Sequence, residues 1–168
     1  TASQTKTVPV PDGFNFDMWL GPAPEAEYCP ARVGVNFRWN LDYSGGQLTD
    51  WGGHHPDCAQ WGLGTERSSP VAIKNQKAQW AKHPVYNTAT EYYFECHYAS
   101  GVKMLIANRD QRPADEREVR WRGGVTFIGE DGWVWADRGR HHASSKAIPK
   151  EEIGPAATHP YPTANTQP

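Results

Sequence analysis

The stretch TEYYFECHYASGVKMLIAN, residues 90–108, contains the clearest structural pattern in this sequence. Within residues 90–99, side chains suited to a covered face alternate with more polar ones, which is the period of a β-strand. The covered face would carry Tyr92, Phe94, Cys96 and Tyr98, and the other face Glu91, Tyr93, Glu95 and His97. Ser100-Gly101 supplies a tight turn into a second alternating run at 102–108. The sequence therefore predicts an antiparallel β-hairpin here.

Further β segments lie on both sides of this hairpin. Residues 71–80 precede it as a strand candidate, and residues 125–128 and 133–137 follow it as a second hairpin. A helical period over residues 45–62 comes before all of them. Because helix and loop come first and successive strands follow, we expect an α+β fold: one large, mostly antiparallel open sheet over residues 71–137, with helices packed on one face.

The segment at 45–62 has two distinct sides when it is drawn as a helix. One side repeats apolar positions at steps of three and four, and the other gathers polar groups within about 60° of one another. The polar side would carry Asp50, His54, Asp57 and Trp61. Pro56 disfavours helical geometry at His55 and removes a hydrogen bond, so we expect a kink or restart at Pro56, with Asp50 and His54 on the first segment.

Charge and composition exclude several classes of function. The 168 residues carry 17 Lys and Arg against 19 Asp and Glu, a formal net charge of −2, which argues against nucleic acid or an anionic membrane as a partner. No apolar run approaches the ~18 residues of a membrane span, and no signal peptide is recognisable. Three separated cysteines without a CxxC pair encode neither a disulfide framework nor a zinc ribbon. We expect a cytoplasmic protein, with periplasmic export by a signal on another part of the protein left open.

The chain is expected to contain three regions. Residues 1–12 are polar and interrupted by prolines, as an interdomain linker would be, and residues 13–153 form the main domain. Residues 154–168 are proline-rich without a hydrophobic period, and we expect them to be extended or disordered. The charged run at 109–122 is expected to be a solvated excursion. Because the chain begins with Thr1, we expect it to be the back part of something longer.

The strongest chemical pattern is Gly45-Gly46-x-x-x-Asp50-x-x-x-His54. Glycines allow a backbone to approach a ligand closely, and a spacing of four residues stacks a carboxylate and an imidazole on one helical face. An imidazole is a suitable proton acceptor near neutral pH, and a nearby carboxylate can orient it or hold the same substrate. The spacing alone is also typical of a capping or surface pair.

Three segments make this pattern more specific. They are FDMWLGPAP (16–24), YSGGQLTDWGGHHPDCAQWGLG (43–64) and GVTFIGEDGWVWADRGR (124–140). Together with FRWNLDY (37–43), they resemble the C-terminal domain of the Gfo/Idh/MocA family of NAD(P)-dependent oxidoreductases. The resemblance implies an α/β domain with a large, mostly antiparallel sheet, helices on one face and often an oligomer contact on the other. It also implies a partner Rossmann domain that binds NAD or NADP.

The resemblance assigns roles to single residues. The family pattern Gly-Gly-Gly-x-x-x-Asp-x-x-x-His lands on Ser44, Gly45, Gly46, Asp50 and His54, with serine in place of the first glycine. It implies that His54 is the general base that takes the proton of a sugar or polyol hydroxyl while a hydride leaves for the nicotinamide. Asp50 assists it or binds the sugar, and Gly45 and Gly46 lie close to the cofactor. Residues 13–153 would then be the substrate-binding and catalytic domain.

The family's nucleotide-binding motifs do not occur in this sequence. None of the 16 glycines forms Gly-x-Gly-x-x-Gly, and no lysine lies in a Glu-Lys-Pro triplet. We therefore expect the dinucleotide to be bound mainly by a missing N-terminal Rossmann domain, so that this chain alone would be inactive. Polar-tipped loop residues near the motif or between strands are further candidates for substrate binding. They are Arg38, Trp39, Tyr43, Tyr86 and Asn87.

Other interpretations stay open or are disfavoured. Adjacent histidines seldom reach one metal ion, so we expect no metal site; His55 is expected to pack beside Trp51, and His141 and His142 to lie in a surface loop. A non-catalytic carbohydrate-binding or oligomerisation module, and a nicotinamide-dependent glycosidase, remain alternatives. We expect a homo-oligomer formed through the exposed sheet face that bears Tyr93 and His97.

Overall fold

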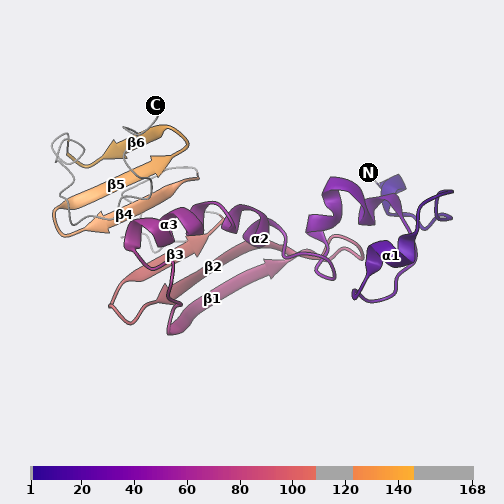
Figure 1. Ribbon diagram of the computed structural model, residues 1–168, viewed down its shortest axis with the longest axis horizontal. Coiled ribbons are helices and arrows are strands. Elements are labelled where there is room, and N and C mark those ends of the chain that lie inside the picture. Colours follow the sequence, from indigo (N-terminus) through magenta and orange to yellow (C-terminus); the bar gives the residue numbers. More distant parts are fainter. Residues whose placement is uncertain (1, 109–122, 146–168) are drawn as a thin grey trace, which may run out of the picture.

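The computed structural model describes residues 2–108 and 123–145. The predicted excursion at 109–122 and the predicted tail at 154–168 lie outside these residues. In Figure 1 the described chain is elongated, with an N-terminal lobe (residues 2–43) at one end and all the strands at the other. No helix among the described residues is both long and apolar enough to cross a bilayer.

The predicted hairpin forms the centre of the first sheet. Its strands are β1 (Ala72–Trp80), β2 (Ala89–His97) and β3 (Lys103–Ala107), in the order β1-β2-β3 with both pairs antiparallel. Phe94 pairs with Ile106 and Cys96 with Met104, so the apolar members of the two alternating runs share one face. The hairpin and the preceding strand are therefore confirmed within a residue or two of their predicted ends.

The strands after residue 123 form a second sheet. They are β4 (Val125–Gly129), β5 (Gly132–Asp137) and β6 (Arg140–Ala143), again antiparallel and in sequence order. The α+β class and the antiparallel pairing are confirmed, but the described strands form two small sheets in place of one large sheet. The expectation of a surface loop at His141 and His142 was wrong, because both residues pair with β5 as part of β6.

The predicted helix at 45–62 is two helices. Within residues 2–108 and 123–145, the helices are η1 (Ala2–Thr5), α1 (Phe16–Leu20), η2 (Pro30–Arg32), η3 (Gly34–Trp39), α2 (Gln47–Gly52) and α3 (His55–Leu63), where η marks a 3-10 helix. The break falls at Gly53, which caps α2, and Pro56 lies in the first turn of α3. Proline fits the first turn because the amide it lacks has no intrahelical partner there. A restart near Pro56 is therefore confirmed, but the break comes at Gly53, so His54 is not part of the first helix.

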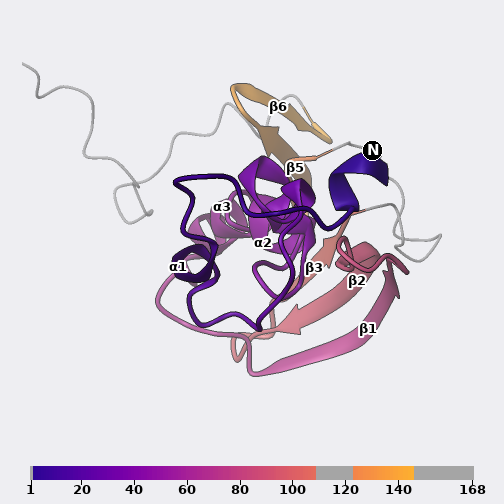
Figure 2. The same cartoon turned by 90° about the vertical axis from the view of Figure 1, so that its right-hand side faces the viewer.

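Helix α3 lies between the two sheets, as Figures 1 and 2 show from two directions. Its buried Ala59 belongs to the core cluster formed with Cys96, Tyr98 and Met104 of the first-sheet region. Where α3 meets the second sheet, Gly62 lies directly against the ring of Phe127 on β4. A side chain at Gly62 would overlap this ring. The helix is thus held by small residues where each sheet approaches it.

The N-terminal lobe is packed by its own aromatic rings. Phe16 stacks on Trp19 with 5.7 Å between ring centroids and meets Tyr28 edge-on at 5.2 Å, and Trp19 meets Tyr43 edge-on at 5.0 Å. The Asn15 side chain caps α1 by accepting a hydrogen bond from the amide of Met18. Ring packing of this kind gives a loop-rich segment with several prolines a defined shape.

A polar cluster occupies the face of the first sheet that points away from the helices. The Tyr93 hydroxyl donates to one oxygen of Glu95 at 2.8 Å, and His97 Nε2 lies 2.9 Å from the other oxygen. Tyr93 and Glu95 are only 4% and 8% exposed. Hydrogen bonds, foremost from Asn75 and then from Tyr93 and His97, lower the pKa of Glu95 to about 2. The expectation that Tyr93 lies on an exposed sheet face was therefore wrong, because its side chain is buried.

Glu95 should make stability depend on acid pH. Its pKa in the folded chain lies below the ordinary value of 4.5, so its stabilisation is present above about pH 4.5 and is lost as pH falls toward about 2. Glu95→Gln should lower the free energy of unfolding at pH 7, and the gap to the wild type should narrow over that pH range. Urea unfolding at pH 7, 4 and 2.5 measures it, with the exposed Glu66→Gln as the control for charge. A gap independent of pH would contradict the assignment.

Gly46 should be intolerant of a side chain. Its φ of 68° is a conformation that favours glycine, and a Cβ there would lie 2.6 Å from Oγ1 of the buried Thr88. Gly46→Ala should therefore lower the free energy of unfolding by about 2–4 kcal/mol, from backbone strain and overpacking together. Gly64 has a φ of 64° with open space around it, so Gly64→Ala should cost about 1 kcal/mol through strain alone. Equal losses in the two variants would show that the contact with Thr88 is irrelevant.

Candidate active site

The two glycines that open α2 form a closed turn. The Gly46 amide donates to the carbonyl of Arg38 at 2.8 Å, and the Gly45 amide donates to the Thr49 hydroxyl at 3.0 Å. Both amide donors are therefore used within the chain. The prediction that Gly45 and Gly46 lie near a cofactor accordingly rests on close approach of a bare backbone, and not on hydrogen bonds from these amides.

Asp50 is paired with arginine. Its Oδ2 accepts a hydrogen bond from Arg38 Nη1 at 2.7 Å, and the two side chains are 28% and 37% exposed. Arg38 is fixed further by its Nε, which donates to the carbonyl of Val35, and by its position 5.7 Å from the ring centre of Trp39. A charge-assisted bond of this length is among the stronger hydrogen bonds, so the pair holds the carboxylate in one orientation.

His54 lies at the junction between α2 and α3 and is exposed. Its amide donates to the carbonyl of Trp51, and its carbonyl accepts from the Cys58 amide in the first turn of α3. Its ring meets Trp51 edge-on with 6.0 Å between centroids. These backbone hydrogen bonds fix the position of the His54 Cα, and the Trp51 ring packs against the His54 imidazole.

The expectation that Asp50 and His54 share one helical face was wrong. Helix α2 ends at Gly52, because two consecutive glycines leave the chain free to turn, and His54 belongs to the start of the next segment. For these two described residues no hydrogen bond joins carboxylate and imidazole, since Asp50 binds Arg38. The two side chains are adjacent along the chain but are held by different neighbours.

The remaining predicted substrate-binding residues divide into two groups. Asn87 supports the Trp39 loop, donating its amide to the Trp39 carbonyl and accepting the Leu41 amide at its side-chain oxygen. Tyr43 packs within the N-terminal lobe, and Tyr86 packs against the cluster that Cys29 and Ala31 of this lobe form with Val85. The Tyr43 hydroxyl accepts a hydrogen bond from Arg32 at 3.0 Å, and Tyr86 stacks on His83. Arg38, Trp39 and Asp50 are therefore brought together, whereas Tyr43 and Tyr86 are engaged elsewhere.

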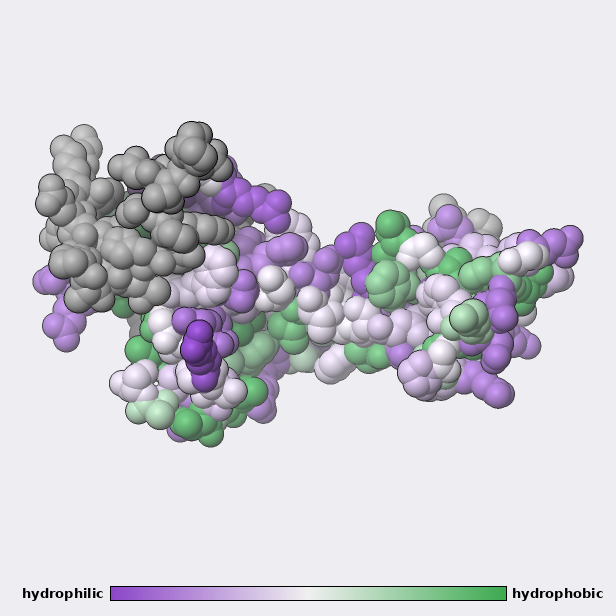
Figure 3. Space-filling model, in the orientation of Figure 1, coloured by the Kyte–Doolittle hydropathy of each residue, from purple (hydrophilic) through white to green (hydrophobic). Residues whose placement is uncertain are grey.

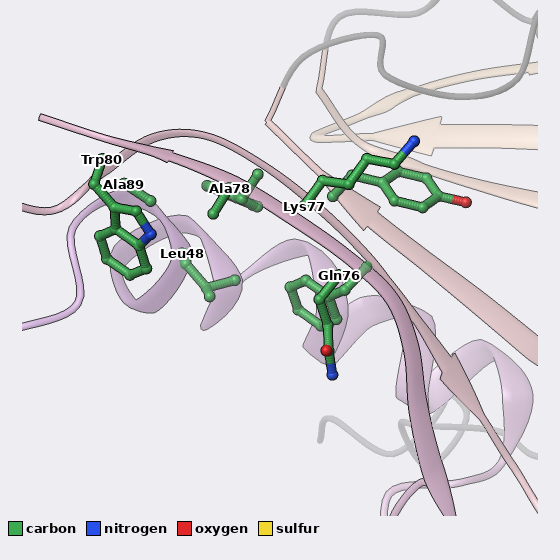
Figure 4. A pocket seen from close by; sticks show the side chains of 9 residues that line it. Leu48, Gln76, Lys77, Ala78, Trp80 and Ala89 are labelled. Atoms are coloured by element: carbon green, nitrogen blue, oxygen red, sulfur yellow. The ribbon is translucent and has the colours of Figure 1, made fainter.

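A shallow pocket of about 310 Å³ lies between α2 and the edge strand β1. Figure 4 shows Leu48 of α2 facing Ala78 and Trp80 across it, with Gln76 and Lys77 farther along the strand. Its lining includes neither Asp50 nor His54. Trp80 is 56% exposed, and sequence reasoning did not select it, because in a strand pattern a tryptophan reads as a packing residue.

Metal ligation has no support among the described residues. Within 2–108 and 123–145, no three His, Cys, Asp or Glu side chains gather in a way that could hold a metal ion. Cys58 is exposed on α3, while Cys29 and Cys96 are buried. Burial raises the pKa of the Cys96 thiol, as expected for a cysteine that packs like a small apolar residue.

Comparison with known proteins places the chain in a family. A family model described as "Oxidoreductase family, C-terminal alpha/beta domain" matches residues 2–124, which include the glycine turn, Asp50, His54 and the whole first sheet. No curated protein and no solved structure matches the chain. The matched span covers well over half of the 168 residues. The chain therefore belongs to the Gfo/Idh/MocA oxidoreductase family and contains its C-terminal α/β domain.

Proposed function

We propose that this chain is the substrate-binding and catalytic half of an NAD(P)-dependent oxidoreductase that acts on a sugar or polyol hydroxyl. The observation that carries the proposal is the exposed imidazole of His54, four residues after a fixed carboxylate and inside the residues that match the oxidoreductase domain. Alcohol oxidation needs a base that the substrate hydroxyl can reach, and polar groups that hold the substrate.

The chemistry assigned to the chain is proton removal. A carbinol carbon that loses a hydride becomes a carbonyl as its hydroxyl proton departs, so a base must lie at that hydroxyl. His54 accepts this proton. When bound, the nicotinamide ring supplies the hydride acceptor.

The Asp50–Arg38 pair holds the substrate in place. The carboxylate accepts hydrogen bonds and the guanidinium donates them, so together they match the paired donors and acceptors of neighbouring sugar hydroxyls. Trp39 lies under the guanidinium and offers a flat apolar surface to a sugar ring. Substrate binding in this proposal therefore depends on Arg38, Trp39 and Asp50, and proton transfer depends on His54.

The dinucleotide is assigned mainly to a Rossmann half outside this sequence. The sequence has no Gly-x-Gly-x-x-Gly fingerprint, and both amides of the Gly45-Gly46 turn are already used within the chain. The residues present therefore suit contact with one edge of a cofactor and not the binding of its phosphates.

We expect activity only in a protein that carries both this chain and a Rossmann half. The 168-residue chain alone should neither bind NAD(P) nor turn over substrate. In the longer protein, His54→Ala should lower kcat by roughly 10²- to 10⁴-fold, the usual effect of a positioned general base, and Asp50→Asn should lower it less. Steady-state kinetics on a panel of polyols and sugars measures this.

The cofactor Kd provides the control, because His54→Ala leaves the Rossmann half unchanged and should leave that Kd close to the wild-type value. An unaltered kcat would end the assignment of His54 as base. A collapsed cofactor affinity would show that His54 has a structural role. If the protein cleaved glycosides and did not oxidise alcohols, its function would be that of a nicotinamide-dependent glycosidase.

We also propose that the chain forms a homo-oligomer through its first sheet. The edge strand β1 is exposed over almost its whole length, and Val71, Ile73 and Trp80 around it are 69%, 50% and 56% exposed. Figure 3 shows apolar surface at this end of the molecule. Large exposed apolar side chains along one edge strand are typical of a surface that another subunit covers.

Light scattering at micromolar concentration tests the oligomer. The wild type should have at least twice the monomer mass, and Ile73→Lys should reduce it because a charge would be buried at the contact. Ile128→Lys on β4, where the side chain is 72% exposed, is the matched control and should keep the wild-type mass. A monomeric wild type would refute the proposal.

A further inference from the structure

Asp137 at the end of β5 and Arg138 in the β5–β6 turn contact one residue on each side of the α2–α3 junction. The guanidinium carbon of Arg138 lies 5.6 Å from the ring centre of Trp51, and Asp137 Oδ1 lies 3.8 Å from His55 Nε2. Trp51 is in α2 and His55 opens α3, with His54 between the two helices. One turn thus reaches the chain on both sides of the proposed base.

Trp51 connects Arg138 to His54, because its ring contacts both side chains. Its ring lies 6.0 Å from the ring of His54 and 5.5 Å from the ring of His55, with Arg138 at 5.6 Å. The indole is 44% exposed, so it is not locked by burial on all sides. A cation over its face favours one orientation of the indole. The orientation of the indole sets which part of the Trp51 ring the His54 imidazole contacts.

His55 supplies the second contact. Its Nε2 is buried and has no hydrogen-bond partner, and it faces Asp137, whose side chain is 14% exposed. The other oxygen of Asp137 accepts a hydrogen bond from Arg140 at 2.8 Å, which fixes the carboxylate. A buried imidazole nitrogen with a carboxylate just beyond hydrogen-bond distance is drawn toward that carboxylate. The start of α3 is thereby tied to the turn.

We propose that the β5–β6 turn, through Arg138 and Asp137, positions the imidazole of His54 for proton transfer. The inference rests on the proposed function for its catalytic meaning, but the geometry it describes can be tested without turnover. Asp137 and Arg138 are positioning residues, since they act through His55 and Trp51. Both lie beyond residues 2–124, the span that the oxidoreductase domain matches.

Docking of the second sheet does not depend on these contacts alone. The Phe127 ring lies against Gly62, and Val125 packs on the core cluster around Ala59. Variants in the turn should therefore keep the fold while releasing Trp51 and His55. This separation allows positioning to be distinguished from folding.

The first test is NMR of the 168-residue chain. The His54 imidazole signals are assigned by their loss in His54→Gln. Arg138→Gln should shift them although Arg138 is not in contact with His54, because Trp51 changes its orientation; Arg138→Lys keeps a cation over the indole and should restore them. Asp137→Asn should shift them through His55. Arg67→Gln and Asp131→Asn, in other turns, are the matched controls and should leave them unchanged.

Thermal unfolding of each variant accompanies the spectra. Unshifted His54 signals in both Arg138→Gln and Asp137→Asn would overturn the proposal. If one of these variants fails to fold, the other decides the matter, since they reach the junction through different residues.

The second test uses the protein that carries both halves. Arg138→Gln should lower kcat by up to about tenfold with substrate KM nearly unchanged, as for a group that sets geometry without binding substrate. Arg138→Lys should recover most of kcat. Absence of turnover in the wild type would refute the proposed function and leave the NMR result standing. Normal kcat in Arg138→Gln, in an active wild type, would refute the positioning role.

Discussion

Helix α3 contacts both sheets, and the rest of the described structure depends on how closely they approach it. The helix has nine residues, and it meets the first sheet through buried Ala59 and the second through Gly62. Both residues are small, so the sheets lie close to the helix axis and their larger residues, Met104 and Phe127, fill the space. Because the helix starts at His55, this packing also fixes where the proposed base begins.

The local elements were predictable because their signals are local. Alternation in residues 90–108 is a property of neighbouring residues, and the turn at Ser100-Gly101 fixes the pairing of the two strands. The division into two sheets is different, because it depends on which distant strands pair, and periodicity carries no such information. Strand β6 was missed because the sequence at 140–143, Arg-His-His-Ala, has no apolar alternation and pairs through its backbone.

The candidate site was predictable in its residues but not in its contacts. The spacing of Asp50 and His54 suggested a shared helical face, yet Gly52-Gly53 ends the first helix before that face is complete. Arg38, the partner of Asp50, was selected for the substrate pocket, and no spacing rule joins residues 12 apart across a turn. Tyr43 and Tyr86 were chosen for their polar tips, but the Tyr43 hydroxyl accepts a hydrogen bond from Arg32 and the Tyr86 ring stacks on His83. Long-range pairing therefore decided which candidates remained near the site.

The polar cluster around Glu95 shows how polar side chains on one face of a sheet can bond one another. Tyr93, Glu95 and His97 alternate along β2 and bond one another, and Asn75 reaches the same carboxylate from β1. Each buried polar group thereby has a partner, so this face need not be apolar to be closed. A strand with polar residues at every second position is not necessarily facing water.

Asn75 also affects how the edge of the sheet can grow. It has a φ of 55°, and the register of β1 against β2 shifts between Lys74 and Lys77 on either side of it. An uninterrupted edge strand is a template to which further strands add without limit, as in a fibril. The irregularity divides β1 into two short runs bordered by lysines, and neither offers a long straight edge. The irregularity therefore limits each run of β1 to a short pairing surface, which disfavours the strand-upon-strand addition that builds a fibril.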